Sequence, residues 1–386
     1  MEKKKLCVLA ISLSSGGAER VISLLLKNLV HDFDVTLILL SNNIFFKTPK
    51  NLKIICLGKP EVLDTTSPFS KLKNMAQFVF KYRAIAKSEK FDVVMSFLAL
   101  PNIINGMVTT KLTPKPKTII SERCFPTKMY DKNNFAMRVA KTFYPRYYNK
   151  TDVLFSNSLH INKDLKDNFG IKIPTELIYN PIEIDDQKTH KDSYKLNEQF
   201  KVISVGSHTP AKNQILLLKA VRHLNSGYSL TIPGAGPLTD ELNNFAEKNN
   251  LENQLNLPGS VTNVKDYLLQ NDCFVLSSNT EGFPNVLLEA MAAGLPVIST
   301  NCLSGPLEIL NDNEPVSIPK GEFYLAKYGI LINTEDDLAL SKAILFLRNH
   351  KEDRKKYSDL GFQKAQNFSL PKIYEQVKQL INNQTN

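Results

Sequence analysis

The sequence predicts an α/β protein of two domains, each a parallel sheet with helices on both faces. Short β-branched or apolar runs alternate with amphipathic segments along the chain, which is the pattern of repeated strand–helix–strand units. This alternation is interrupted by a polar stretch over residues 183–199 and then restarts. At 386 residues the chain is long enough for two hydrophobic cores of ordinary size.

The predicted elements fill both halves of the chain. In the first half the predicted strands are residues 6–11, 35–40, 53–57, 93–97, 118–121 and 153–156. Helical periodicity there is clearest over residues 18–29 and 71–87. In the second half the predicted strands are residues 202–205, 230–233, 255–257, 273–276, 297–300 and 330–332. The predicted helices of this half are residues 214–224, 238–248, 264–269, 286–292, 336–349 and 351–366.

A last helix, predicted at residues 371–381, comes after the second domain is complete. Pro371 suits a first helical position, where its missing N–H would have no helical partner. We expect this helix to pack back on the first domain. The predicted organisation is an N-terminal domain (1–182), a linker (183–199), a C-terminal domain (200–370) and the returning C-terminal helix (371–386).

The charge of the chain is unevenly distributed. Residues 1–150 hold 25 Lys and Arg against 10 Asp and Glu, a balance of +15, whereas the rest carries −5, which gives the total of +10. This excess indicates an anionic partner for the first half, either an acidic membrane surface or a nucleic acid. Solubility charge on helix faces is the alternative. Nucleic acid is the weaker interpretation because no RRM, KH, zinc or helix–turn–helix signature is present.

The sequence also bears on where the protein works. No apolar stretch approaches the roughly 20 residues that span a bilayer. The apolar run at residues 6–13 is short and is followed by Glu19 and Arg20, so it predicts a buried strand rather than a signal peptide. The five cysteines are scattered, odd in number and without a CxxC pair. They fit a reducing compartment and argue against a structural zinc site.

Two loops that follow predicted strands and open helices have features of phosphate-binding loops. In the first, residues 14–20, the paired Gly16 and Gly17 let backbone approach a ligand at a helix start. This loop matches neither GxGxxG nor the P-loop, and its glycines also suit a plain turn. In the second, residues 205–213, Lys212 can neutralise a diphosphate or be an exposed surface lysine.

The segment from Asn279 to Met291 is the strongest signal. Glu281 falls in a loop after a predicted strand, Asn285 is expected to cap the next helix, and Glu289 lies one turn further on. The first helical residues, Val286 to Leu288, are expected to expose unpaired N–H groups that suit a phosphate. The two carboxylates then flank an elongated ligand. Spacing alone does not distinguish this arrangement from two solvated acids.

These residues resemble a known family. Glu281 and Glu289 form the E-x7-E signature of retaining glycosyltransferases with the GT-B fold, in the large fourth family. The similarity is nearly continuous over residues 257–310, and the glycine loop (16–20), a linker motif (178–181) and a G-x-G-P turn (234–238) occur in the expected order. The resemblance implies two Rossmann-like domains that face a cleft.

The resemblance also implies a mechanism. A nucleotide sugar, UDP-linked, is held mostly by the second domain, with Glu289 on the ribose and Glu281 on the transferred sugar. The implied donor site is Gly16, Gly17, Ser207, Lys212, Glu281, Gly282, Phe283, Pro284, Asn285, Val286, Leu287 and Glu289. The expected catalytic residues are Glu281, Lys212 and Arg123. Similar enzymes retain anomeric configuration and need no metal or other cofactor, because amides and basic side chains neutralise the leaving diphosphate.

Two positions depart from the family pattern. The family usually has Arg after the glycine of the Lys212 loop, and here that residue is Ser207, followed by His208 where an apolar residue is usual. Many relatives carry His near the position of Arg123. We hypothesise that Arg123 supplies part of the positive charge that Ser207 lacks. The alternative is a surface arginine on a loop.

The basic first half suits the acceptor. Residues 71–87 and 134–150 interleave basic and aromatic side chains, which fits an anionic membrane interface or an acceptor that bears a diphosphate. The candidate acceptor or membrane residues are Lys73, Lys81, Arg83, Arg138 and Lys141. The apolar stripes are expected to face the core, and merely solvated lysines are the alternative.

The sequence therefore predicts a transferase that moves a hexose or N-acetylhexosamine to a hydroxyl of a lipid-linked glycan, in bacterial surface polysaccharide or glycoconjugate synthesis. The expected location is cytoplasmic, peripheral on the inner face of the membrane. Two alternatives remain open. A nucleotide-sugar epimerase has a similar architecture, but no acid–base set beyond Glu281 and Glu289 is visible. A non-catalytic nucleotide-sugar-binding subunit would fit the loss of the arginine at Ser207.

Overall fold

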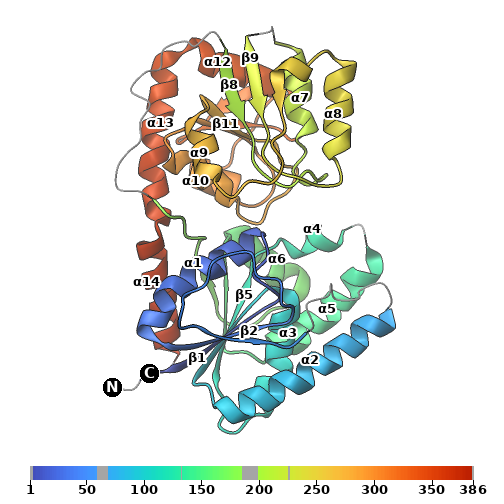
Figure 1. Ribbon diagram of the computed structural model, residues 1–386, viewed down its shortest axis with the longest axis vertical. Coiled ribbons are helices and arrows are strands. Elements are labelled where there is room, and N and C mark those ends of the chain that lie inside the picture. The colour runs from blue at the N-terminus through green and yellow to red at the C-terminus, as the bar shows by residue number, and fades with distance from the viewer. Residues whose placement is uncertain (1–2, 59–67, 132, 185–198, 225–226, 385–386) are drawn as a thin grey trace. The chain divides into compact units, whose positions relative to one another are not determined.

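The computed structural model describes residues 3–58, 68–131, 133–184, 199–224 and 227–384, with only the backbone described for residues 68–72. It divides into two compact units, drawn in Figure 1. Unit 1 comprises residues 1–181 and 370–386, and unit 2 comprises residues 182–369. Most of the linker predicted at 183–199 lies outside the described residues. Each unit is a sheet covered by helices, which confirms the predicted α/β class.

Unit 1 is built on a parallel sheet of order β3-β2-β1-β4-β5-β6-β7. Its strands are β1 (Lys5–Ala10), β2 (Asp34–Leu39), β3 (Lys53–Cys56), β4 (Val93–Phe97), β5 (Lys117–Glu122), β6 (Val153–Ser156) and β7 (Thr175–Leu177). The strand order reverses between β1 and β4. The loops after these two strands therefore diverge at the carboxyl edge of the sheet, where open α/β sheets bind their ligands.

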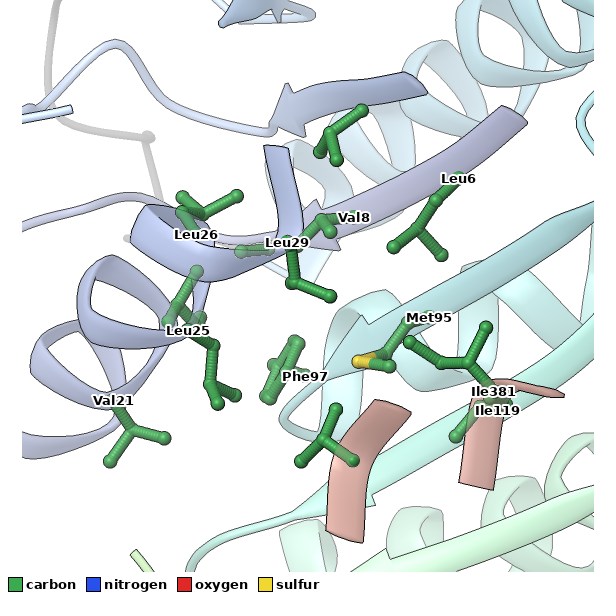
Figure 2. Close-up of a cluster of buried hydrophobic side chains, with 14 of the residues drawn as sticks. Leu6, Val8, Val21, Leu25, Leu26, Leu29, Met95, Phe97, Ile119 and Ile381 are labelled. Carbon is green, nitrogen blue, oxygen red and sulfur yellow. The ribbon is translucent and has the colours of Figure 1, made fainter. Parts of the chain in front are cut away.

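The helices of unit 1 are α1 (Gly17–Asp32), α2 (Pro68–Glu89), α3 (Ala99–Val108), α4 (Pro126–Tyr130), α5 (Asn134–Tyr148), α6 (Leu159–Phe169) and α14 (Leu370–Asn383). Figure 2 shows Leu25 and Leu29 of α1 in one apolar cluster with Phe97 of β4 and Ile381 of α14. Burial of such side chains is the main force that holds these elements together.

The C-terminal helix α14 belongs to unit 1. The Tyr374 hydroxyl donates to the carboxylate of Asp32 on α1, and Lys378 Nζ lies 3.0 Å from the other Asp32 oxygen. Both contacts lower the pKa of Asp32, the Tyr374 hydrogen bond most. Together with the shared apolar cluster, they confirm the prediction that the last helix returns to the first domain.

Unit 2 has a second sheet, of order β10-β9-β8-β11-β12-β14-β13, parallel except for its last pair. Its strands are β8 (Phe200–Ile203), β9 (Tyr228–Thr231), β10 (Leu255–Asn256), β11 (Cys273–Leu276), β12 (Val297–Thr300), β13 (Phe323–Leu325) and β14 (Ile330–Ile332). Its helices are α7 (Ile215–Arg222), α8 (Thr239–Lys248), α9 (Val264–Leu269), α10 (Asn285–Ala292), α11 (Pro306–Asn311), α12 (Asp337–Asn349) and α13 (Lys351–Ala365). Here the strand order reverses between β8 and β11.

The predicted strands and helices are present, with ends that differ by up to about three residues. The sequence does not predict β7 and β13, which are three residues each and lie at the edges of the two sheets. Neither strand is buried along its length, so both lack the continuous buried run that reveals the central strands, and pairing with a neighbouring strand decides their conformation.

Candidate functional site

Two loops of unit 2 start side by side where the strand order of its sheet reverses. Strands β8 and β11 are neighbours, with Cys273 opposite Val202. The loop after β8 carries Lys212, and the loop after β11 carries Glu281. This position leaves strand ends and loop backbone accessible to a ligand. The fold thereby brings together two predicted site residues that lie 69 positions apart in the sequence.

Lys212 and Glu281 form an ion pair. Lys212 Nζ donates to Glu281 Oε1 at 2.6 Å, and Ser278 Oγ donates to the same oxygen at 2.6 Å. The Glu281 side chain is only 7% exposed and that of Lys212 27%, so neither a solvated acid nor a plain surface lysine describes them. Among the described residues nothing donates to Glu281 Oε2. Since an ammonium has three N–H donors, Lys212 can bind a phosphate while Oε2 accepts from a sugar hydroxyl.

Further hydrogen bonds hold these two loops against each other. Asn213 Nδ2 donates to Asn279 Oδ1 at 3.1 Å, and the Asn279 N–H donates to the Ala211 carbonyl at 2.8 Å. Ser277 Oγ donates to the Lys212 carbonyl at 3.0 Å. These contacts fix the backbone of both loops. The positions of the Lys212 ammonium and the Glu281 carboxylate are therefore set by the loops as well as by the ion pair itself.

The helix that carries Glu289 begins one residue earlier than expected. Asn285 is its first residue and Pro284 its cap, so the prediction that Asn285 caps the helix is wrong. Pro284 has extended ψ, and its carbonyl accepts from the Leu287 N–H at 3.1 Å. The amide of Leu287 is therefore not unpaired, contrary to the prediction. Glu289 is half-buried on the same helix.

A loop after β12, which is not among the site residues predicted from the sequence, supports the Glu281 loop. Ser304 Oγ donates to the Gly282 carbonyl at 2.6 Å. Gly305 has a φ of +98°, and a Cβ there would lie 2.4 Å from Pro284 Cδ, so a side chain does not fit. The signal that points to this loop is a glycine directly before Pro306, at the start of α11.

The loop after β8 also packs against the G-x-G-P turn. A Cβ on Gly234 would lie 2.0 Å from the Gly206 carbonyl, so close backbone contact requires glycine there. Ser207 is exposed, whereas His208 is fully buried with Nδ1 2.8 Å from Thr239 Oγ1. Burial lowers the pKa of His208, so its ring is neutral at pH 7 and does not replace the charge that Ser207 lacks.

In unit 1 the glycine loop follows β1, beside the reversal of strand order in that sheet. Gly16 is the cap of α1, and a Cβ there would lie 2.2 Å from Glu19 Oε2. Ser14 Oγ donates to Glu19 Oε1 at 3.4 Å, and burial raises the pKa of Glu19. Gly17 is exposed as the first helical residue. The absence of a side chain at Gly16 lets the Glu19 carboxyl pack closely at the start of α1.

Arg123, directly after β5, is only 5% exposed, so the alternative of a surface arginine is wrong. Its Nε donates to Ser121 Oγ at 2.8 Å, and its Nη1 donates to Asn180 Oδ1 at 2.6 Å. The guanidinium carbon also lies 5.6 and 4.8 Å from the ring centroids of Phe97 and Phe155. Arg123 therefore ties the end of β5 to the stretch where the chain leaves unit 1.

Glu122 is buried next to Arg123. The Tyr148 hydroxyl donates to Glu122 Oε2 at 2.8 Å, and the Arg123 N–H donates to Oε1 at 3.2 Å. Burial nevertheless raises the pKa of Glu122 to about 7. The loss of hydration on burial thus outweighs the two hydrogen bonds and the neighbouring guanidinium.

The raised pKa of Glu122 predicts a pH-dependent stability. The folded protein holds the Glu122 proton up to about pH 7, whereas the ordinary pKa is 4.5. This carboxyl therefore favours the folded state at low pH, and that contribution is lost as pH rises from 4.5 to about 7. The free energy of unfolding of the wild type should fall by about 3 kcal/mol over this window. Glu122→Gln should abolish this fall, as measured by urea unfolding at several pH values. Glu176→Gln, an exposed carboxylate on β7, should keep the wild-type slope; an unchanged slope in Glu122→Gln would contradict the assignment.

The candidate acceptor or membrane residues lie exposed on two helices of unit 1. They are Lys73, Lys81 and Arg83 on α2, and Arg138 and Lys141 on α5. As expected, the apolar stripe of α2 faces the core, where Tyr82 is fully buried and Met75 packs on a buried cluster. Large apolar side chains are also exposed on these helices, Phe80 at 76% on α2 and Phe135 at 72% on α5.

None of the helices in the described part of the chain combines the length and apolar character that a membrane crossing requires. The same residues contain no cluster of three His, Cys, Asp or Glu side chains able to hold a metal ion.

Comparison with known proteins decides the family. Residues 15–186 match Glycosyltransferase Family 4, and residues 185–364 match Glycosyl transferases group 1. The chain is 30% identical over 374 residues to the N-acetylgalactosamine-N,N'-diacetylbacillosaminyl-diphospho-undecaprenol 4-alpha-N-acetylgalactosaminyltransferase of Campylobacter jejuni, covering 96% of this chain and 97% of the relative. This chain belongs to glycosyltransferase family 4. The transferase is also 26% identical over 382 residues, 98% of each chain, to the GalNAc-alpha-(1->4)-GalNAc-alpha-(1->3)-diNAcBac-PP-undecaprenol alpha-1,4-N-acetyl-D-galactosaminyltransferase of the same organism.

Solved structures show the fold of the transferase. HepE of Anabaena in complex with UDP has a TM-score of 0.76 at 16% identity, covering 98% of this transferase and 100% of HepE. Sucrose-phosphate synthase of Thermosynechococcus elongatus has a TM-score of 0.79 at 17% identity, covering 99% of each chain. The predicted GT-B fold is therefore confirmed. As a member of a retaining, metal-independent family, the transferase moves a sugar from a nucleotide-sugar donor with retention of configuration.

Proposed function

We propose that this transferase moves an N-acetylhexosamine from a UDP-linked donor to a hydroxyl of a glycan carried on polyprenyl diphosphate. The observation that carries the proposal is the 30% identity, over nearly the whole chain, to an N-acetylgalactosaminyltransferase with a diphospho-undecaprenol acceptor. A second relative transfers the same sugar to a related lipid-linked glycan. The structural relative HepE, solved with UDP, supports the choice of nucleotide.

The proposal assigns a role to each part of the donor site. Lys212 neutralises the diphosphate as negative charge builds up on it, which is the electrostatic task that a metal performs in other enzymes. Glu281, held by Lys212 and Ser278, accepts a hydrogen bond from the transferred sugar through Oε2. Glu289 binds the ribose. The other predicted donor-site residues of unit 2 supply backbone contacts around these groups, except Leu287, whose N–H already donates to the Pro284 carbonyl.

The donor can be identified by thermal unfolding with a panel of UDP- and GDP-linked sugars. A ligand at 100 times its dissociation constant stabilises the folded state by about 2.7 kcal/mol, so the true donor should raise the melting temperature most. We expect a UDP-N-acetylhexosamine to do so, and the purified chain to transfer its sugar to a lipid-linked acceptor. Binding without transfer would favour a non-catalytic partner subunit. Interconversion of the donor sugar without acceptor would favour an epimerase.

Because the proposed acceptor is linked to a lipid, we expect the transferase to bind an anionic membrane surface through α2 and α5. We expect co-sedimentation with liposomes to require anionic lipid and to weaken as salt is added. Arg138→Glu combined with Lys141→Glu should reduce binding, because it reverses two exposed charges on α5 near Phe135. Lys219→Glu, on the exposed side of α7 in unit 2, serves as the control. Binding indifferent to lipid charge and salt would refute the membrane role.

A further inference from the structure

A short segment of unit 1, Asn43–Phe46, is fixed directly beside the glycine loop. The Leu13 N–H donates to the Asn43 carbonyl at 2.9 Å, and the Phe45 N–H donates back to the Leu13 carbonyl at 2.9 Å. Leu13 and Ile44 thus form a parallel bridge outside the main sheet. Because Leu13 immediately precedes residues 14–17, the segment is held at the carboxyl edge of the sheet, next to β1 and to the reversal of strand order.

This segment presents apolar side chains to solvent at that edge. Ile44 is 41% exposed and Phe45 is 53% exposed. The Phe45 ring is held edge-on against Phe46, with centroids 5.2 Å apart, and Arg20 lies over the Phe46 ring at 5.7 Å. An exposed aromatic ring on a backbone fixed by hydrogen bonds is a rigid surface that loses little conformational entropy when it binds a ligand.

Polar side chains belong to the loop and helix start that flank the Leu13–Ile44 bridge. Arg20 is on the first turn of α1, and Ser14 Oγ donates to Glu19 Oε1 beside it. Ser12 Oγ donates to Ser14 Oγ at 3.2 Å in the same loop. A hydrocarbon chain can pack on the ring but cannot hydrogen-bond to these groups. A pyranose ring has one apolar C–H face and a rim of hydroxyls, so it can do both.

We propose that Phe45 is a stacking platform for a sugar ring of the acceptor glycan and thereby a specificity-determining residue. The inference rests on the proposed function. The acceptor rather than the donor is assigned to Phe45 because the charged pair suited to the donor, Lys212 and Glu281, belongs to unit 2. Phe45 acts by positioning the acceptor and takes no part in the chemical step.

Kinetics with a short-chain, water-soluble prenyl-diphosphate glycan test this role. Phe45→Ala should raise the acceptor KM about tenfold and leave the donor KM unchanged, whereas Phe45→Tyr should restore the wild-type value. Tyr324→Ala, which removes an exposed aromatic ring from β13 in unit 2, should change neither constant. An unchanged acceptor KM, or an equal rise in the donor KM, would overturn the proposal.

A second measurement does not depend on turnover. The chain contains no tryptophan, so Phe45→Trp introduces a single tryptophan, whose emission can be excited selectively over that of the tyrosines. Titration with the lipid-free acceptor glycan should shift its emission, and Tyr324→Trp should not respond. A response to the prenyl diphosphate without sugar, or none to the glycan, would overturn the stacking role. Failure of the proposed function is distinct, since it would leave the wild-type chain without transfer whatever the emission shows.

Discussion

Lys212→Ala is expected to lower kcat for sugar transfer by a factor of about 100 to 1,000, because it removes a preorganised charge that stabilises the leaving diphosphate. The change also leaves Glu281 as a buried carboxylate held by Ser278 without its counter-ion. A buried acceptor that loses a charged partner costs about 1–3 kcal/mol, so the melting temperature should fall measurably. Steady-state kinetics and thermal unfolding of one preparation give both numbers.

The control for this variant is Lys219→Ala, which removes an exposed lysine from α7 a short distance along the chain. Its kinetics and melting temperature should match the wild type, since exposed ion pairs contribute little. Lys212→Ala enzyme with wild-type kcat would show that the ion pair is only structural and would remove Lys212 from the catalytic residues.

If Arg123 supplies charge that Ser207 lacks, Arg123→Ala is expected to lower the turnover of the folded protein by more than its loss of stability explains. We expect kcat to fall by about two orders of magnitude, in the range found when one charge-stabilising donor is lost. The buried contacts to Asn180 and to the rings of Phe97 and Phe155 mean that stability falls as well. Kinetic measurements at temperatures below the midpoint of thermal unfolding separate the loss of turnover from the loss of stability. Turnover near that of the wild type would reject the hypothesis.

A matched variant distinguishes a direct role from an indirect one. Asn180→Ala removes the acceptor of the 2.6 Å hydrogen bond and keeps the guanidinium. If Arg123 acts through its own charge, Asn180→Ala should retain most of the turnover. Equal losses in the two variants would instead make Arg123 a positioning residue that acts through Asn180.

The sequence was most informative where burial is continuous. The strands Val93–Phe97 and Cys273–Leu276 lie where predicted because each is an unbroken apolar run at the centre of a sheet. The predicted start of α10 is one residue too late. The cap is Pro284, which has no N–H and contributes only its carbonyl at the helix start, and residue spacing does not reveal this.

The candidate site was predictable as a set of motifs but not as a set of contacts. Lys212 and Glu281 belong to separate motifs, and only the adjacency of β8 and β11 makes them an ion pair. Ser278 and Ser304 lie within the stretch that resembles the family, but the sequence does not reveal what they bind, since the partner of a serine hydroxyl depends on the geometry around it. The sequence did not reveal that Arg123 is buried, because a charged residue after a strand is usually exposed. The rings of Phe97 and Phe155 and the hydrogen bonds around the guanidinium explain its burial.

The discontinuity of unit 1 has a consequence for biosynthesis. Its apolar cluster needs Ile373, Val377 and Ile381 of α14, which leave the ribosome only after the whole of unit 2. Unit 2 is a single continuous stretch, so its core needs no residue from later in the chain. The half of the transferase that is synthesised first is therefore the half that is finished last, and until then its unfilled apolar surface is what chaperones would have to shield.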